Sequence, residues 1–198
     1  LFIGLDKKVN VDGKGRLIPI NFDNAATTPP FKRVMKMILE TSEYYGSIAR
    51  GDGKKSQYCS DLYENSRKYI LEYFNAPEDI YTAIFVGNTT DGLNKLSNIL
   101  IEDKDDIVIT TRMEHHSNDL PWRNKCNLKH VEVDKDGRLI VEEIEMLLEK
   151  YQERVKYVTV TGASNVTGYV NDIRRIARAT HKYGAKIIVD GAQLIPHK

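Results

Sequence analysis

Short β-branched runs that stop abruptly at polar residues are the feature that most restricts how this chain can fold. The clearest is Lys186-Ile187-Ile188-Val189, which leads directly into Asp190-Gly191-Ala192-Gln193. Stretches with the apolar spacing of helices separate these runs along the chain. Strands that alternate with helices predict an α/β domain built on a mostly parallel sheet flanked by helices. The expected strands are residues 82–86, 107–110, 129–133, 155–161 and 186–189.

The expected helices and the N-terminal region complete this outline. Residues 1–30 are expected to form an extended arm with a short strand at 18–22, and residues 31–198 to form part of one larger domain. Pro29 and Pro30 suit the start of the first helix, because the backbone N–H groups there have no intrahelical partner. The expected helices are residues 31–45, 56–74, 91–101, 141–151 and 172–183.

Composition argues against several classes of protein. The 198 residues include 29 Lys and Arg against 28 Asp and Glu, so the net charge of +1 gives no reason to expect nucleic-acid binding. No apolar run approaches the length of a membrane span. Cys59 and Cys126 have no metal-site spacing and predict no disulfide framework, so a reducing cytoplasm is expected.

Asp190 follows the last strand, where a ligand site is expected. The carboxyl ends of parallel strands meet at one edge of a sheet, and ligands of open α/β sheets bind at that edge. A buried carboxylate there needs a positive partner, and a pyridinium nitrogen meets that need. A helix cap and a metal ligand are the alternative roles for a single Asp after a strand.

Three other polar segments lie at the ends of expected elements. At Gly87-Asn88-Thr89-Thr90-Asp91-Gly92, free N–H groups of a helix start and two hydroxyls suit a phosphate, although the pattern is also that of a simple N-cap. At Glu114-His115-His116, an imidazole ring can stack on a planar cofactor or transfer protons, and two surface histidines are the alternative. Adjacent residues point in different directions, so a metal site is not expected there. Ser164-Asn165-Val166-Thr167-Gly168 is also typical of a turn.

In this order, the four segments resemble those of the class V aminotransferase family, pyridoxal-phosphate (PLP) enzymes that include cysteine desulfurases and selenocysteine lyases. The resemblance covers residues from about 22 to 197. It implies the large domain of the PLP-transferase fold (fold type I, as in aspartate aminotransferase). It also implies an amino-acid substrate and a homodimer.

The resemblance assigns roles around the cofactor ring. His115 is implied to stack on the ring and to act in catalysis, with His116 in support. Asp190 is implied to keep the ring nitrogen protonated, so that the ring can accept electrons. Asn165 and Gln193 are implied to lie near the 3′-oxygen of the ring, Asn165 also near the substrate carboxylate.

The resemblance also assigns the phosphate and the substrate side, with some departures. Thr89 and Thr90 are implied to bind the phosphate, in a segment where Asn88 and Asp91 replace a glycine and a glutamate of the family. Ala26 and Arg50 are implied to lie on the substrate side. Ala49 stands where many desulfurases have histidine, which weakens the inference of cysteine as the ordinary substrate.

The family's Schiff-base lysine is expected a short way after Asp190, in a segment of the type Ser-Gly-His-Lys that this sequence lacks. Lys198 is not a substitute, because Asp190 must face the ring nitrogen, opposite the carbon that the lysine attacks. The sequence is therefore expected to be the N-terminal half of a longer enzyme and to be inactive alone. The rest of the large domain and a small domain would follow.

Three functions remain open from the sequence. The first is a PLP-dependent cysteine desulfurase or selenocysteine lyase, as the full-length parent. The second keeps the PLP fold but makes the parent a transaminase or another lyase, and a downstream loop cysteine would separate these two. The third is a non-catalytic binding or structural protein.

Overall fold

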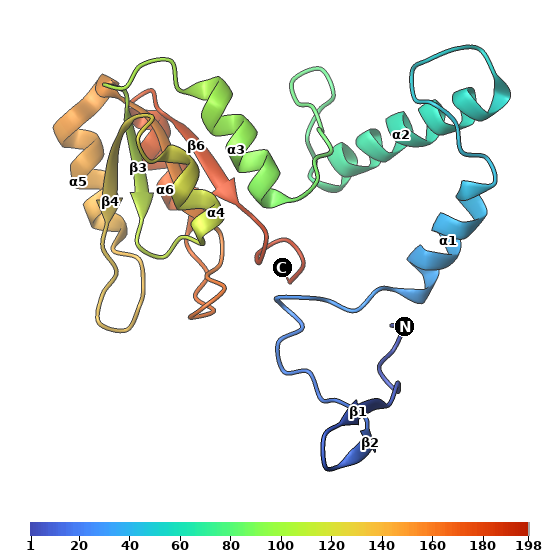
Figure 1. Cartoon of the computed structure of the whole chain (residues 1–198). Coiled ribbons are helices and arrows are strands. Elements are labelled where there is room, and N and C mark those ends of the chain that lie inside the picture. Colours follow the sequence, from blue (N-terminus) through green and yellow to red (C-terminus); the bar gives the residue numbers. More distant parts are fainter. Residues whose placement is uncertain (198) are drawn as a thin grey trace. The chain divides into compact units, whose positions relative to one another are not determined.

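The structure is a computed structural model that describes residues 1–197, and Figure 1 shows the whole chain. The chain divides into two compact units, Leu1–Phe85 and Val86–Lys198. Each unit is described by itself below. The second unit contains the sheet and most of the residues for which the sequence predicts a role.

The first unit contains a small hairpin and two helices. Strands β1 (Val9–Val11) and β2 (Gly15–Leu17) pair antiparallel, and helices α1 (Lys32–Ser42) and α2 (Lys54–Tyr73) follow. The expected strand at 18–22 was wrong, because the paired segment ends at Leu17. Helix α1 has an amphipathic sequence but no buried residue, so its apolar face is not covered within this unit.

The strand expected at 82–86 was also wrong. These residues form no regular element and join no strand ladder among the described residues, and a strand exists only where a neighbour completes its hydrogen-bond ladder. The side chain of Arg67 takes the place of such a neighbour. Its Nε donates to the Ala83 carbonyl at 2.9 Å, and its Nη2 donates to Thr82 Oγ1 at 2.7 Å.

The second unit is an α/β domain, as the sequence predicts. Its four strands are all parallel and lie in the order β4-β3-β5-β6. Helices α3 to α6 are arranged around this sheet (Figure 1). Short 3₁₀ turns at Leu120–Trp122 and Gln152–Arg154 complete the unit. In chain order the elements are α3 (Thr89–Leu100), β3 (Ile107–Thr111), α4 (His116–Asp119), β4 (Asn127–Val131), α5 (Val141–Tyr151), β5 (Val155–Thr161), α6 (Ile173–Lys182) and β6 (Lys186–Asp190).

Burial on both faces of the sheet explains why its strands are apolar runs. One face packs on α5 and α6, where Ile144, Leu148 and Ile176 are fully buried against alternate residues of β3 and β5. On the other face Thr159 Oγ1 donates to Asn118 Oδ1 of α4 at 2.6 Å, and both residues are fully buried. The second face therefore carries polar groups, and it supplies much of the candidate site.

Candidate functional site

Three strand ends meet at one edge of the sheet and carry polar side chains. Because β3, β5 and β6 are parallel neighbours, their carboxyl ends lie together. His115 follows β3, Asn165 follows β5, and Asp190 is the last residue of β6. This is the edge at which open α/β sheets bind ligands.

Helix α3 is joined to this edge by a chain of hydroxyl groups. Thr90 Oγ1 lies 2.7 Å from Ser117 Oγ, which lies 2.9 Å from His115 Nδ1. The backbone N–H of Ser117 also donates to His115 Nδ1 at 3.1 Å. A backbone N–H only donates, so Nδ1 is the acceptor and a neutral His115 carries its proton on Nε2. The imidazole is thus held by one nitrogen while the ring stays exposed.

The start of α3 keeps donors free for an anion. Asn88 Oδ1 accepts the Asp91 N–H at 2.9 Å as the N-cap. Within the described chain this leaves the N–H groups of Thr89 and Thr90 and the Thr89 hydroxyl as donors for a ligand, while the Thr90 hydroxyl contacts Ser117. Hydrogen bonds from the Lys95 ammonium and then from the Gly87 N–H lower the pKa of Asp91. A hollow of about 310 Å³ opens beside Thr90, lined also by residues of α4 and the turn after it.

Asp190 is a buried carboxylate with no cationic partner within residues 1–197. Its side chain is 4 % exposed, and Oδ1 accepts the Ala192 N–H at 3.0 Å. No described Lys, Arg or His lies within ion-pair distance of it. The turn after Asp190 packs closely against the residue that follows β5. A Cβ added to Gly162 there would lie 2.7 Å from Cδ2 of Leu194 in the turn. A positively charged ring nitrogen is the kind of partner that this carboxylate fits.

Glu114 lies between β3 and β5, next to this carboxylate. Oε1 accepts from Thr111 Oγ1 at 2.7 Å and from the Thr161 N–H at 2.9 Å, and Oε2 accepts from Asn118 Nδ2 at 2.6 Å. Burial raises the pKa of Glu114 to about 7, with the negative charge of Asp190 adding to the rise and the three hydrogen bonds opposing it.

Sequence reasoning assigned no role to Glu114 or Ser117. Both belong to a segment that the sequence singles out, but their partners come from elsewhere in the chain. Glu114 binds Thr161, which is 47 residues away, and Ser117 binds Thr90, which is 27 residues away. The available signal was the position of Glu114, a lone carboxyl group between a strand end and a histidine.

The remaining expected site residues have fewer contacts. Asn165 is exposed and Gln193 is partly buried at the same edge of the sheet, beside the turn in which Ser164 Oγ accepts two backbone N–H groups. Ala26 and Arg50 are exposed residues of the first unit. Their role stays a prediction. Lys198 lies outside the described residues.

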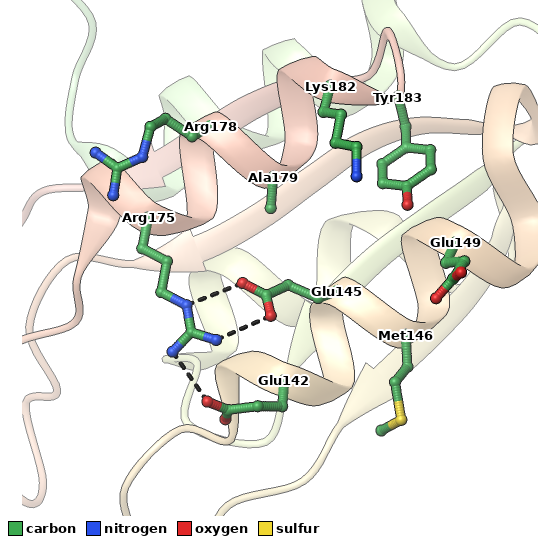
Figure 2. A pocket seen from close by; sticks show the side chains of 9 residues that line it. All are labelled: Glu142, Glu145, Met146, Glu149, Arg175, Arg178, Ala179, Lys182 and Tyr183. Atoms are coloured by element: carbon green, nitrogen blue, oxygen red, sulfur yellow. Dashed lines mark hydrogen bonds and ion pairs between the residues drawn. The ribbon is translucent and has the colours of Figure 1, made fainter.

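A larger groove, of about 550 Å³, lies between α5 and α6 and not at the strand ends. Figure 2 shows an acidic row on α5 facing a basic row on α6. Arg175 bridges the two rows, with Nη1 2.9 Å from Glu142 and Nη2 2.8 Å from Glu145. Glu149, Arg178 and Lys182 also line the groove and make no ion pair among the described residues. The groove thus joins two helices away from the strand ends. The sheet edge remains the candidate site.

Within residues 1–197, no group of three His, Cys, Asp or Glu side chains is placed to hold a metal ion. Across the same residues, every helix is too short or too polar to cross a membrane.

Comparison with known proteins gives the class. The family model for aminotransferase class V matches residues 20–198. The chain therefore belongs to the aminotransferase class-V family, and the predicted resemblance is confirmed.

The similar proteins are named as cysteine desulfurases. A "Probable cysteine desulfurase" of Borreliella burgdorferi is 34% identical over 90% of this chain and 44% of its own length. A cysteine desulfurase of Enterobacter sp. is 32% identical over 88% of this chain and 44% of its own length. The chain thus spans less than half the length of these relatives.

Solved structures confirm the predicted fold. The apo structure of cysteine desulfurase from Thermococcus onnurineus superposes with a TM-score of 0.77 at 32% identity, over 89% of this chain and 44% of that one. A NifS-like protein gives a TM-score of 0.75 at 25% identity over 88% of this chain and 49% of its own. The sheet with its flanking helices is therefore the α/β arrangement of fold-type-I PLP enzymes.

Glu114 gives a prediction for stability against pH. Its pKa is about 7 in the folded chain against 4.5 ordinarily, so between these pH values the folded state binds more protons than the unfolded state. Its contribution to stability is complete below pH 4.5 and is lost as the pH rises through 7. We expect a loss of about 3 kcal/mol of unfolding free energy from this group.

The measurement is urea unfolding at a series of pH values, on the cofactor-free form of the complete gene product that carries this sequence. Glu114→Gln is expected to flatten the fall in stability over this range. Glu132→Gln, at an exposed carboxylate, is the matched control and is expected to keep it. Equal slopes in all three proteins would contradict the assignment.

Proposed function

We propose that this chain supplies the phosphate-binding and ring-binding part of a PLP-dependent cysteine desulfurase. The observation that carries the proposal is the buried Asp190, which has no cation among the described residues and lies at the ligand edge of the sheet. The names of the similar proteins support cysteine as the substrate. A homodimer belongs to the proposal through the family resemblance alone, and a cytoplasmic location through the absence of a disulfide pattern in the sequence.

The proposed roles follow from the chemistry of each side chain. Asp190 binds the ring nitrogen and keeps it protonated, since its carboxylate is buried and has no cationic partner among the described residues. Thr89 and Thr90 bind the phosphate with their hydroxyls and N–H groups at the positive end of α3. PLP, when bound, supplies an electron sink that allows bonds of an amino-acid substrate to break.

The histidine and the two amides complete the proposed site. His115 covers one face of the ring and presents its Nε2–H, because Ser117 holds Nδ1. Asn165 and Gln193 offer amide groups that suit the 3′-oxygen, and both keep these groups free of recorded hydrogen bonds within the described chain. Each residue binds or orients, and none needs a metal ion for its role.

The test uses the complete gene product, purified with and without added PLP. We expect it to bind PLP with a new visible absorbance and to convert cysteine to alanine, with sulfide released when a thiol reductant is added to take up the sulfur. Selenocysteine as a parallel substrate and a keto acid as an amino acceptor distinguish the lyase and transaminase alternatives. Thr90→Val is expected to raise the Kd for PLP about tenfold, since one hydrogen bond to a charged group is lost. The exposed loop variant Asp136→Ala is the control, and absence of PLP binding would contradict the proposal.

A further inference from the structure

We propose that Glu114 is a positioning residue of this site: its carboxylate joins the β3–α4 turn to the end of β5 beside Asp190, and its negative charge strengthens binding of the cationic ring. The inference rests on the proposed function and assigns a role to a residue for which the family resemblance supplied none. Its support is geometric, and it comes from three elements that converge on one carboxyl group.

All three partners of Glu114 donate hydrogen bonds to its carboxylate. The Thr161 backbone N–H donates to Oε1 at 2.9 Å, and the Thr111 hydroxyl donates to the same oxygen at 2.7 Å. Asn118 Nδ2 donates to Oε2 at 2.6 Å. Thr111, Asn118 and Thr161 are all buried, so water does not replace these donors. These three donors require both oxygens of the Glu114 side chain to accept hydrogen bonds.

The side-chain amide of Asn118 cannot flip to accept a hydrogen bond from a different residue at position 114. Its Oδ1 accepts from Thr159 Oγ1 at 2.6 Å and from Trp122 Nε1 at 3.4 Å. An indole N–H only donates, so the amide oxygen must face Trp122 and the amide nitrogen must face Glu114. A glutamine at 114 would place a donor against a donor at one of these contacts. The network therefore favours a carboxylate at this position.

Glu114 also lies close to Asp190. Thr161, which donates to Glu114, is the register partner of Asp190 in the β5–β6 ladder. The next residue, Gly162, donates its N–H to the Asp190 carbonyl at 2.8 Å. The two carboxyl groups thus flank the end of β5, and their charges add at the point where a ring nitrogen would bind.

The other charged groups around Glu114 are engaged elsewhere. His115 is held through Ser117, Asp119 pairs with Arg123 and His130, and Arg112 pairs with Glu132. Of the charged groups on β3 to β6 and α4, Asp190 is the one whose charge acts on the pKa of Glu114. A cation bound beside Asp190 would relieve the repulsion between the two carboxylates.

The experiment compares the apparent Kd for PLP of Glu114→Gln and wild type across a pH series in the complete gene product. Glutamine resembles the protonated acid, so the ratio of the two Kd values is expected to be small near pH 6. It is expected to rise about tenfold toward pH 8, where wild-type Glu114 is ionised. Dividing the values removes the titration of PLP itself. Glu132→Gln is the control and is expected to give a flat ratio.

The outcomes separate this inference from the proposed function. A wild-type protein that does not bind PLP contradicts the proposed function. If the wild type binds PLP but the ratio of the Glu114→Gln Kd to the wild-type Kd does not change with pH, the role of Glu114 is overturned and the proposed function is not. If Glu114→Gln does not fold, Thr111→Val replaces it. That variant keeps the carboxylate but removes one donor, so the pH step in PLP binding is expected to move upward, and an unmoved step overturns the proposal.

Discussion

Replacing Asp190 with alanine is expected to lower turnover roughly a hundred- to a thousandfold in the complete gene product, the effect of removing one preorganised charge from such a site. Binding of PLP is expected to weaken far less, because the phosphate contacts proposed for Thr89 and Thr90 do not involve Asp190. The reason for the difference is that a protonated ring nitrogen matters most when the ring accepts electrons in the transition state.

The measurement is alanine formation at saturating cysteine and PLP with a thiol reductant present, with the Kd for PLP determined in parallel. Asp190→Asn is the isosteric companion, since it removes the charge while an oxygen can still accept the Ala192 N–H. Asp136→Ala, in the exposed loop before α5, is the control and is expected to retain wild-type turnover. Near-normal turnover in Asp190→Ala would show that Asp190 is not the partner of the ring nitrogen.

Replacing Trp122 with alanine is expected to lower the free energy of unfolding by about 3–5 kcal/mol, the range for truncating a fully buried aromatic side chain. Trp122 is 0% exposed, and its indole N–H donates to Asn118. The variant therefore opens a cavity and also removes the donor that fixes the amide of Asn118.

Leu120→Ala tests whether this loss comes from burial. Leu120 belongs to the same 3₁₀ turn but is 51% exposed, so its truncation is expected to change stability by less than about 1 kcal/mol. Urea unfolding followed by circular dichroism measures both variants. Similar losses in the two proteins would contradict the packing described for Trp122.

Local patterns were sufficient to predict most of the second unit. Helix α5 lies at the residues predicted for it, because its apolar spacing and acidic first turn agree with its burial against the sheet. Strand β6 was predicted from a β-branched run that ends at Asp190, and the structure places both there. In these elements local preference and tertiary packing favour the same state.

The wrong strand prediction at residues 82–86 has a non-local cause. The segment 82–86 has the composition of a strand, yet pairing decides whether a strand forms, and a sequence pattern does not give the partner. The same reasoning applies to the contacts of Glu114. A carboxyl group before a histidine is visible in the sequence, but its meeting with Thr161 depends on the register of β3 and β5.

The most direct test of the site is the protonation state of bound PLP. With PLP labelled with ¹⁵N in its ring, NMR of the complete gene product reports whether the ring nitrogen carries a proton. We expect a protonated nitrogen in the wild type and an unprotonated one in Asp190→Ala, both with PLP bound. A protonated nitrogen in both proteins, or a wild type that binds no PLP, would contradict the assignment of this sheet edge as the cofactor site.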